Sequence, residues 1–307
     1  MKNNSIKTIS YDIISPQPSF RWRRWPGLLA VCAALLVCLA TPVAAQTVAI
    51  ITDLTGKVSM QGAAAKRDIT ILSEISVGTR LQIDGGAHVV VLYTGSGDEY
   101  AFNGPTLIEF RAGAPEAISG TKPLKRTSAV GKGADIRINT ASTMQAGYVM
   151  RSGRAAAQLK LLSPMGSKTL ETTPEFRWQD LQPGAKYQFE LTDETGKSLY
   201  ETSVQGTALK LPVSVVLKDG VGYTWEVSVR LADGRRYLSA GDFSLATAEL
   251  RARAEALRPT TGAPVSERVA YAAWLMQENL QDEARRYWRA LAAERPDDAR
   301  LKVLAAE

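Results

Sequence analysis

Residues 88–110 read HVVVLYTGSGDEYAFNGPTLIEF, and this stretch decides the fold class of the chain. It contains a β-branched run, a Gly-rich turn, an alternating pair at Tyr100 and Phe102, a second turn and a last apolar run. Short strands that alternate with Gly-rich turns are typical of an all-β sandwich or barrel. Similar short apolar runs begin at Val48, so residues 46–158 are predicted to form one β module.

Three features of this module resemble the periplasmic FecR-type domain of ferric-citrate regulator proteins: GKV at 56–58, VGTRL at 77–81 and the strand and turn pattern of 88–110. The resemblance implies a β fold and an envelope location. The regulators carry an anti-sigma segment and a membrane helix ahead of this domain, whereas only a signal-like leader precedes it here. No regulator residue is therefore carried over.

Residues 159–247 are predicted to form a second β module, because apolar residues alternate with polar ones along several short stretches, most clearly at Tyr187, Phe189 and Leu191. This unit resembles fibronectin type III and immunoglobulin-like sandwiches. Trp178 matches their early core tryptophan, and Leu217 with Tyr223 matches the spacing of their tyrosine corner, in which the tyrosine hydroxyl bonds a nearby backbone group. Asp219 stands where that family has a proline.

The last segment, 248–307, changes to helical periodicity and predicts helices over 248–258, from a cap at Ser266 to about 278, and again up to Pro296. Ala284, Trp288 and Pro296 fall at the spacing of one tetratricopeptide repeat, which this hairpin resembles. One repeat cannot bury its own apolar face. We therefore expect the hairpin to pack on the β modules, to cap itself with Leu301 and Leu304, or to present a groove to a partner.

Trp274 is the candidate partner-contact residue of this hairpin. It lies off the apolar stripe of the first helix, which is formed by Val269, Ala272, Ala273 and Met276. Exposed tryptophans often dominate interfaces. The alternative is that Trp274 packs against the β-sandwich.

Residues 1–45 are typical of an export signal, since the basic cluster around Arg23 precedes an apolar stretch and a small-residue site. Cleavage is predicted between Ala45 and Gln46; the alternative is an inner-membrane anchor formed by residues 26–45. Both cysteines, Cys32 and Cys38, lie in this leader, so the mature chain is predicted to lack disulfides and thiol chemistry.

The charge of the chain points away from nucleic acid. Lys and Arg number 37 against 31 Asp and Glu, a net charge of +6, but five basic groups and one acidic group lie in the leader, which leaves +2. A nucleic-acid binder needs a clustered basic excess. No nucleic-acid partner is expected.

No set of residues predicts catalysis, a metal or a cofactor. His88 is the sole histidine, and Gly196-Lys197-Ser198 is a hairpin turn rather than a phosphate loop. The acidic pairs 98–99 and 193–194 are expected to be solvent-facing turn residues. Tyr223, Trp225 and Tyr237 could form a carbohydrate platform, although their alternation favours core packing.

Together these features predict a mainly β protein: two β modules followed by a C-terminal helical hairpin. The predicted function is a non-enzymatic binding or scaffolding module of the bacterial cell envelope, periplasmic or extracellular. Its partner would be an envelope protein or a cell-wall or surface glycan, with no stable membrane insertion after cleavage. The alternatives are a periplasmic sensory or regulatory protein of the ferric-citrate-regulator type and an unrecognised carbohydrate-active enzyme.

Overall fold

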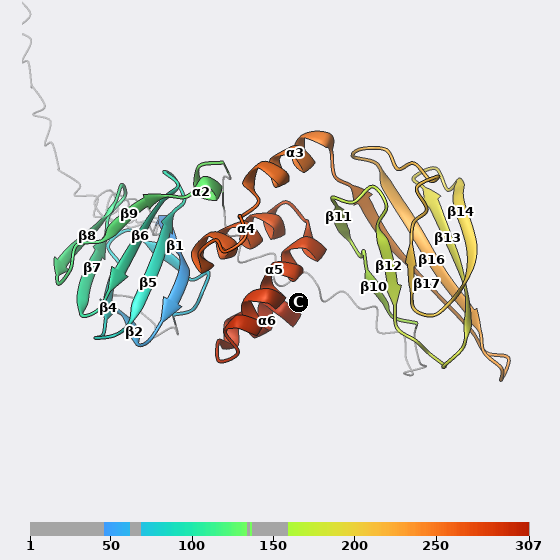
Figure 1. Cartoon of the computed structure of the whole chain (residues 1–307), viewed down its shortest axis with the longest axis horizontal. Coiled ribbons are helices and arrows are strands. Elements are labelled where there is room, and N and C mark those ends of the chain that lie inside the picture. Colours follow the sequence, from blue (N-terminus) through green and yellow to red (C-terminus); the bar gives the residue numbers. More distant parts are fainter. Residues whose placement is uncertain (1–45, 62–68, 134–135, 137–158, 307) are drawn as a thin grey trace, which may run out of the picture. The chain divides into compact units, whose positions relative to one another are not determined.

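The computed structural model describes residues 46–61, 69–133, 136 and 159–306. Within these residues the protein is mainly β, with four sheets and a helical segment at the C-terminal end (Figure 1). The predicted fold class is thereby confirmed. Ala45, on one side of the expected cleavage site, lies outside the described residues, whereas Gln46 on the other side is described and exposed.

The first β region contains two antiparallel sheets, ordered β3-β1-β5-β6-β9 and β2-β4-β7-β8. Its strands are β1 (Thr47–Thr55), β2 (Val58–Gln61), β3 (Glu74–Ser76), β4 (Arg80–Ile83), β5 (His88–Tyr93), β6 (Asp98–Asn103), β7 (Thr106–Phe110), β8 (Pro115–Ser119) and β9 (Leu124–Thr127). The inward residues of both sheets form one core that includes Ile51, Val91, Phe102 and Phe110. This is the sandwich packing that alternating strands favour.

A glycine sets the β6–β7 turn. A Cβ on Gly104 would lie 1.8 Å from the carbonyl oxygen of Asp84, so no other residue fits without a backbone shift. Gly104, in the second turn of the 88–110 stretch, is therefore needed for steric reasons.

Residues 112–132 are mostly exposed but are not irregular. The segment contains β8, β9 and a short helix, α2 (Ala129–Gly133). The strand β9 lies at a sheet edge with all four residues exposed, so no apolar alternation marks it in the sequence. Ile136 is buried and lies outside any strand.

The second β region contains a sheet ordered β10-β12-β15 and a larger sheet ordered β11-β17-β16-β13-β14. The strands are β10 (Leu161–Ser163), β11 (Ser167–Thr169), β12 (Glu175–Trp178), β13 (Lys186–Asp193), β14 (Ser198–Gln205), β15 (Ala208–Lys210), β16 (Gly222–Arg230) and β17 (Arg236–Leu245). All pairs are antiparallel except β11 with β17. An aromatic core joins the two sheets: the ring centroid of Phe176 lies 4.8 Å from that of Phe189 and 5.1 Å from that of Trp225.

The residues expected to organise this core are buried. Trp178 is 1 % exposed and packs edge-on against Tyr187. Leu217 and Tyr223 are also buried, and the hydroxyl of Tyr223 accepts a hydrogen bond of 2.6 Å from the backbone N–H of Lys218. The side chain at position 223 therefore makes the corner bond that its spacing predicts.

The helical segment comprises α3 (Ala248–Leu257), α4 (Val265–Gln277), α5 (Gln281–Glu294) and α6 (Ala299–Ala306). Ala284 and Trp288 of α5 are buried against α4, and the indole Nε1 of Trp288 lies 3.2 Å from the sulfur of Met276. Pro296 follows the end of α5 and is exposed. Leu301 and Leu304 of α6 are buried in the same core, so the helices do cap themselves.

The helical segment also packs on the β strands. Ile50 and Leu92 of the first region belong to its core, and Leu170 of the second region packs against that core. The turn between α4 and α5 is bonded to β11, since the backbone N–H of Lys168 donates to the carbonyl of Asn279 at 2.8 Å. Two of the three arrangements expected for the hairpin therefore occur together.

Ion pairs reinforce these contacts. The guanidinium of Arg295, just after α5, contacts both carboxylate oxygens of Asp53 on β1, at 2.5 and 3.2 Å. Arg251 of α3 bonds the carboxylate of Asp219 at 2.8 Å. Bidentate arginine pairs fix orientation as well as adding energy.

Candidate functional site

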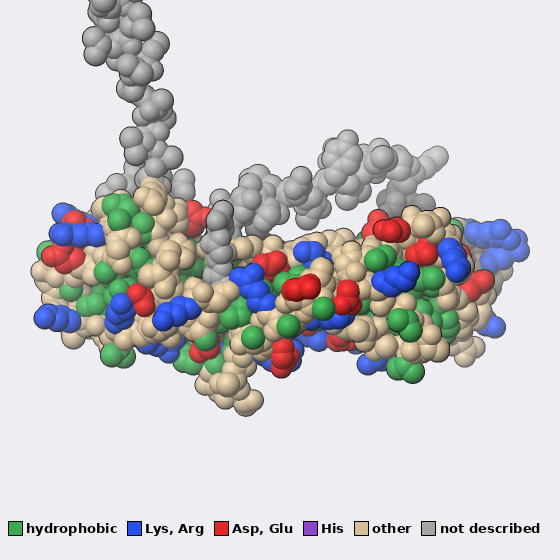
Figure 2. Space-filling model, turned by 90° about the horizontal axis from the view of Figure 1, so that it is seen from above, with side chains coloured by type: hydrophobic (Ala, Val, Ile, Leu, Met, Phe, Trp, Pro, Cys, Tyr) green, Lys and Arg blue, Asp and Glu red, His purple; other side chains and the backbone are tan. Residues whose placement is uncertain are grey.

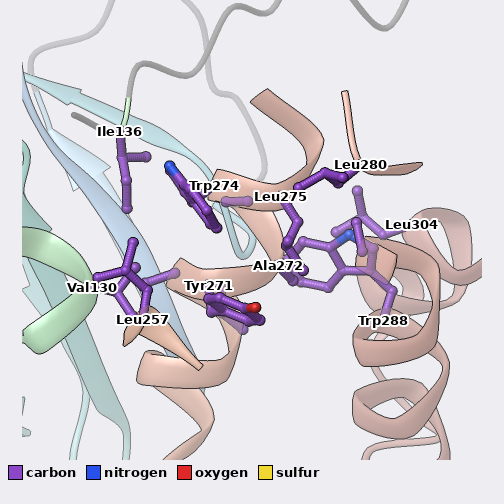
Figure 3. Packing of buried hydrophobic residues seen from close by; sticks show 14 of the residues in the cluster. Val130, Ile136, Leu257, Tyr271, Ala272, Trp274, Leu275, Leu280, Trp288 and Leu304 are labelled. Carbon is purple, nitrogen blue, oxygen red and sulfur yellow. The ribbon is translucent and has the colours of Figure 1, made fainter. Parts of the chain in front are cut away.

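Trp274 is buried, so the expectation that it is an exposed partner-contact residue was wrong. The side chain is 0 % exposed and its ring centroid lies 5.7 Å from that of Tyr271. In Figure 3 the indole lies beside Ile136 and points away from Trp288. The guanidinium of Arg253 covers the ring, 5.5 Å from its centroid, and donates at 2.7 Å to the carbonyl of Gly133.

The burial pattern of α4 explains the error. Every residue from Val269 to Leu275 is buried, because α3, α2 and β1 lie against α4 on one side and α5 on the other. A helix that is apolar all round is a core helix. In the sequence, residues 269–276 are all aromatic or aliphatic, and this pattern indicates a core helix. Treating only four of them as an apolar stripe conceals the pattern.

Ser266, the expected cap of this helix, also has a different role. Ser266 does not cap α4, since Pro264 occupies the N-cap. Ser266 is buried in the second position of α4, where its hydroxyl oxygen lies 2.5 Å from Nη2 of Arg126. It contributes to a polar cluster instead.

This cluster is formed by Glu99 on β6, Arg126 on β9 and Ser266 on α4. The Nε of Arg126 donates to Oε2 of Glu99, and Ser266 lies 3.5 Å from the same oxygen. Glu99 is 1 % exposed, and its Oε1 has no hydrogen-bond partner among the described residues. Burial raises the pKa of the Glu99 carboxyl above its usual value, although the Arg126 guanidinium acts in the opposite direction.

Glu99 was expected to face solvent together with Asp98, and this was wrong for Glu99. Successive residues of a strand point to opposite faces. Asp98 is half-buried at the start of β6, where Lys125 lies 2.9 Å away and lowers the pKa of the Asp98 carboxyl, while Glu99 lies on the opposite face of the strand, under α4. The other acidic pair behaves as expected at Asp193, which accepts hydrogen bonds from the turn residues Thr195 and Lys197.

The aromatic residues considered as a sugar platform are mostly core residues. Trp225 is 0 % exposed and its Nε1 donates to the carbonyl of Pro164 at 2.8 Å. Tyr223 is 4 % exposed, and Tyr237 is half-buried with Arg235 near its ring. Tyr223 and Trp225 therefore pack in the core, which is the alternative that their alternation favours.

The groups with potential chemistry are dispersed. His88 is the first residue of β5, and its Nδ1 lies 2.8 Å from Oδ1 of Asn103. Among the described residues no three His, Cys, Asp or Glu side chains gather as metal ligands. Gly196-Lys197-Ser198 forms the hairpin turn between β13 and β14, as predicted.

A hollow lies where α3 leaves β17. This junction cleft has a volume of about 390 Å³. Its lining combines two basic and two acidic side chains with aliphatic groups: Lys168, Gly220, Ser244, Leu245, Ala246, Thr247, Glu249, Leu250, Arg253 and Glu278.

The charged groups of the junction cleft differ in whether they already have a hydrogen-bond or ion-pair partner. Arg253 is engaged with Gly133 and lies 3.8 Å from Glu278. The ammonium of Lys168 makes no ion pair with a described residue. Backbone hydrogen bonding at the start of α3 lowers the pKa of the Glu249 carboxyl, with Thr247 adding to the effect, so this end of the cleft stays anionic at neutral pH. The cleft thus offers one cation and one anion beside an aliphatic wall.

On the face drawn in Figure 2, basic and acidic side chains are interspersed and no field of one sign covers the described surface. None of the helices in the described part of the chain is long and apolar enough to cross a bilayer.

Comparison with known proteins assigns no family. No protein-family model matches this chain, and no curated protein matches it. Among solved structures, CopC from Methylosinus trichosporium OB3b is 19% identical over 30% of this chain and 96% of its own, with a TM-score of 0.24.

Two other structures have similar scores. A Parabacteroides merdae β-glucuronidase is 16% identical over 29% of this chain and 13% of its own, with a TM-score of 0.21. A tetra-tandem repeat in the extending region of a large adhesion protein is 12% identical over 66% of this chain and 42% of its own, with a TM-score of 0.23. TM-scores of this size are too low to assign fold or function.

Proposed function

We propose that this chain is an exported, non-enzymatic binding or scaffolding protein of the bacterial cell envelope, in which the helical segment links a FecR-like β module to a fibronectin type III-like one. The observation that carries the proposal is the interlocking of the helices with both β regions. Arg295 pairs with Asp53 of the first region, while Arg251 pairs with Asp219 and Arg286 with Glu171 of the second region. Such contacts hold a binding surface in one geometry.

A protein partner fits the surface better than a glycan does. Sugar sites rely on flat aromatic rings that face solvent, whereas Trp178, Trp225 and Trp274 are all buried in cores. The junction cleft instead presents the Lys168 ammonium and the Glu249 carboxylate beside aliphatic groups. A peptide segment with an acidic and a basic side chain would satisfy both charges.

Site-specific photo-crosslinking in living cells tests this proposal. A photo-reactive amino acid at Lys168 should capture one discrete envelope protein, and the Glu249→Lys substitution should reduce that product. The same amino acid at Lys210, an exposed residue of β15 outside the cleft, is the matched control. Equal products from both positions, or none from Lys168, would refute the role of the cleft.

A further inference from the structure

The outer face of the large sheet of the second β region carries an acidic row. Register places Glu190 of β13 directly opposite Glu201 of β14 on one side and opposite Glu226 of β16 on the other. Directly opposed side chains of a sheet lie about 5 Å apart, and like charges there are destabilising. None of these three carboxylates forms an ion pair with a described residue.

The same face carries a basic row at its other end. Arg230 of β16 lies opposite Arg236 of β17. Lys186 of β13 lies one residue beyond the pair Tyr187–Val229, so it takes the position beside Arg230. All three basic side chains are exposed, and none has an ion-pair partner among residues that the structure describes.

The two rows are separated by one row of small or neutral side chains, composed of Ser203, Gln188, Ser228 and Leu238. Glu190 and Lys186 are four residues apart on the same strand, as are Glu226 and Arg230, so the rows lie about 13 Å apart. Leu238 is 63 % exposed, which makes it an apolar group at the β17 end of the middle row, between the two charged rows.

We infer that this face is a self-association surface that binds a second copy of the chain. A two-fold axis along the middle row turns the strands end for end and lays the acidic row of each copy over the basic row of the other. It also brings Leu238 against its symmetry mate. A two-fold axis parallel to the strands would instead oppose acid with acid, so the charge pattern selects one arrangement.

The arrangement agrees with general features of assemblies. Two-fold dimers use the same self-complementary patch on both subunits, and packed sheets lie about 10 Å apart. The repulsion within each row, which nothing in the described residues offsets, is relieved when the opposite charges of the partner copy arrive. This inference is independent of the junction cleft and of the proposed function.

Sedimentation velocity on the purified full chain tests the inference. The chain should form dimers in a concentration-dependent way, and the dissociation constant should rise with salt because exposed charges are screened. Two variants reverse one row each: Glu190→Lys with Glu226→Lys, and Arg230→Glu with Arg236→Glu. Each should raise the dissociation constant by roughly tenfold or more, the equivalent of about 1.4 kcal/mol.

Mixing the two variants is the decisive step. The first variant then has a net positive charge in both rows and the second a net negative charge in both rows, so the mixture should form heterodimers with a lower dissociation constant than either variant has for itself. Lys160→Glu with Lys210→Glu, on exposed residues outside this face, makes the same charge change as the second variant and should leave dimerisation intact. A chain that stays monomeric at all accessible concentrations, a dimer insensitive to both reversals, or a mixture that fails to associate would each overturn the inference.

Discussion

Replacement of Trp274 by Ala distinguishes a core residue from a surface contact. The indole is fully buried among residues of α3, α4 and the first β region. Truncation of a buried tryptophan costs about 3–5 kcal/mol. Loss of the Arg253 guanidinium from the ring face adds about 0.5–1 kcal/mol, since Arg253 is partly exposed.

The expected effect is large enough to measure by thermal unfolding. For chains of this size class, each kcal/mol lowers the melting temperature by about 2–4 °C. Trp274→Ala should therefore lower the midpoint by roughly 7–24 °C. The unfolding is followed by far-UV circular dichroism, which reports on the helices. Val213→Ala, at a side chain that is 87 % exposed, is the control and should shift the midpoint little.

A finer comparison uses phenylalanine in place of each indole. The Nε1 of Trp274 has no hydrogen-bond partner among the described residues, whereas that of Trp288 lies within bonding distance of the Met276 sulfur. Removing a buried N–H without a partner recovers about 1–3 kcal/mol of desolvation cost. Trp274→Phe should thus be milder than Trp288→Phe. A midpoint of Trp274→Ala within a degree of the parent chain would refute the core assignment.

Four further expectations concern other parts of the chain. The raised pKa of Glu99 means that the folded state binds this proton more tightly than the unfolded state does, so the free energy of unfolding falls as the pH rises from the unfolded pKa through the folded one. Glu99→Gln should flatten that fall, which urea titrations at several pH values can measure. An unchanged slope would contradict the assignment. Arg126→Ala should cost about 3–5 kcal/mol at neutral pH, because it leaves the Glu99 carboxylate buried without its ion pair, and unaltered stability would argue against that pair. Tyr223→Phe should cost about 0.5–1.5 kcal/mol by removing the acceptor for the Lys218 N–H, which equilibrium unfolding can measure against the parent. Mass spectrometry of the chain recovered from an exporting host should find Gln46 as the first residue, and an intact leader would support the anchored alternative.

Much of the fold follows from local pattern. Alternation at Tyr187, Phe189 and Leu191 predicts a strand with one buried face, and the structure has all three in the core. The six-residue spacing from Leu217 to Tyr223 predicts the hydroxyl bond to the backbone that is present. These features depend on residues close together in the chain, so a single sequence contains them.

The errors arise where packing from elsewhere decides the environment. Trp274 is off the stripe of one helix face, but α4 is covered on more than one side, so no face was free. Glu99 could not be placed from period-2 alternation alone. Tyr100 and Phe102 mark one face of β6 as the sandwich core, so alternation puts Glu99 on the opposite face, and it is buried there because α4 packs over it.

The rows on the outer face show why a summed charge says little about partners. The net charge of +6, of which +4 lies in residues 1–45, suggests no strong electrostatic preference in the rest of the chain. Yet cross-strand register gathers Glu190, Glu201 and Glu226 into one row and Arg230 with Arg236 into another. Each strand by itself has an ordinary mixture of charged and polar residues, and only the pairing of the strands separates the signs. A charge pattern that selects a partner is therefore a property of register rather than of composition, and it becomes visible once the strands are aligned.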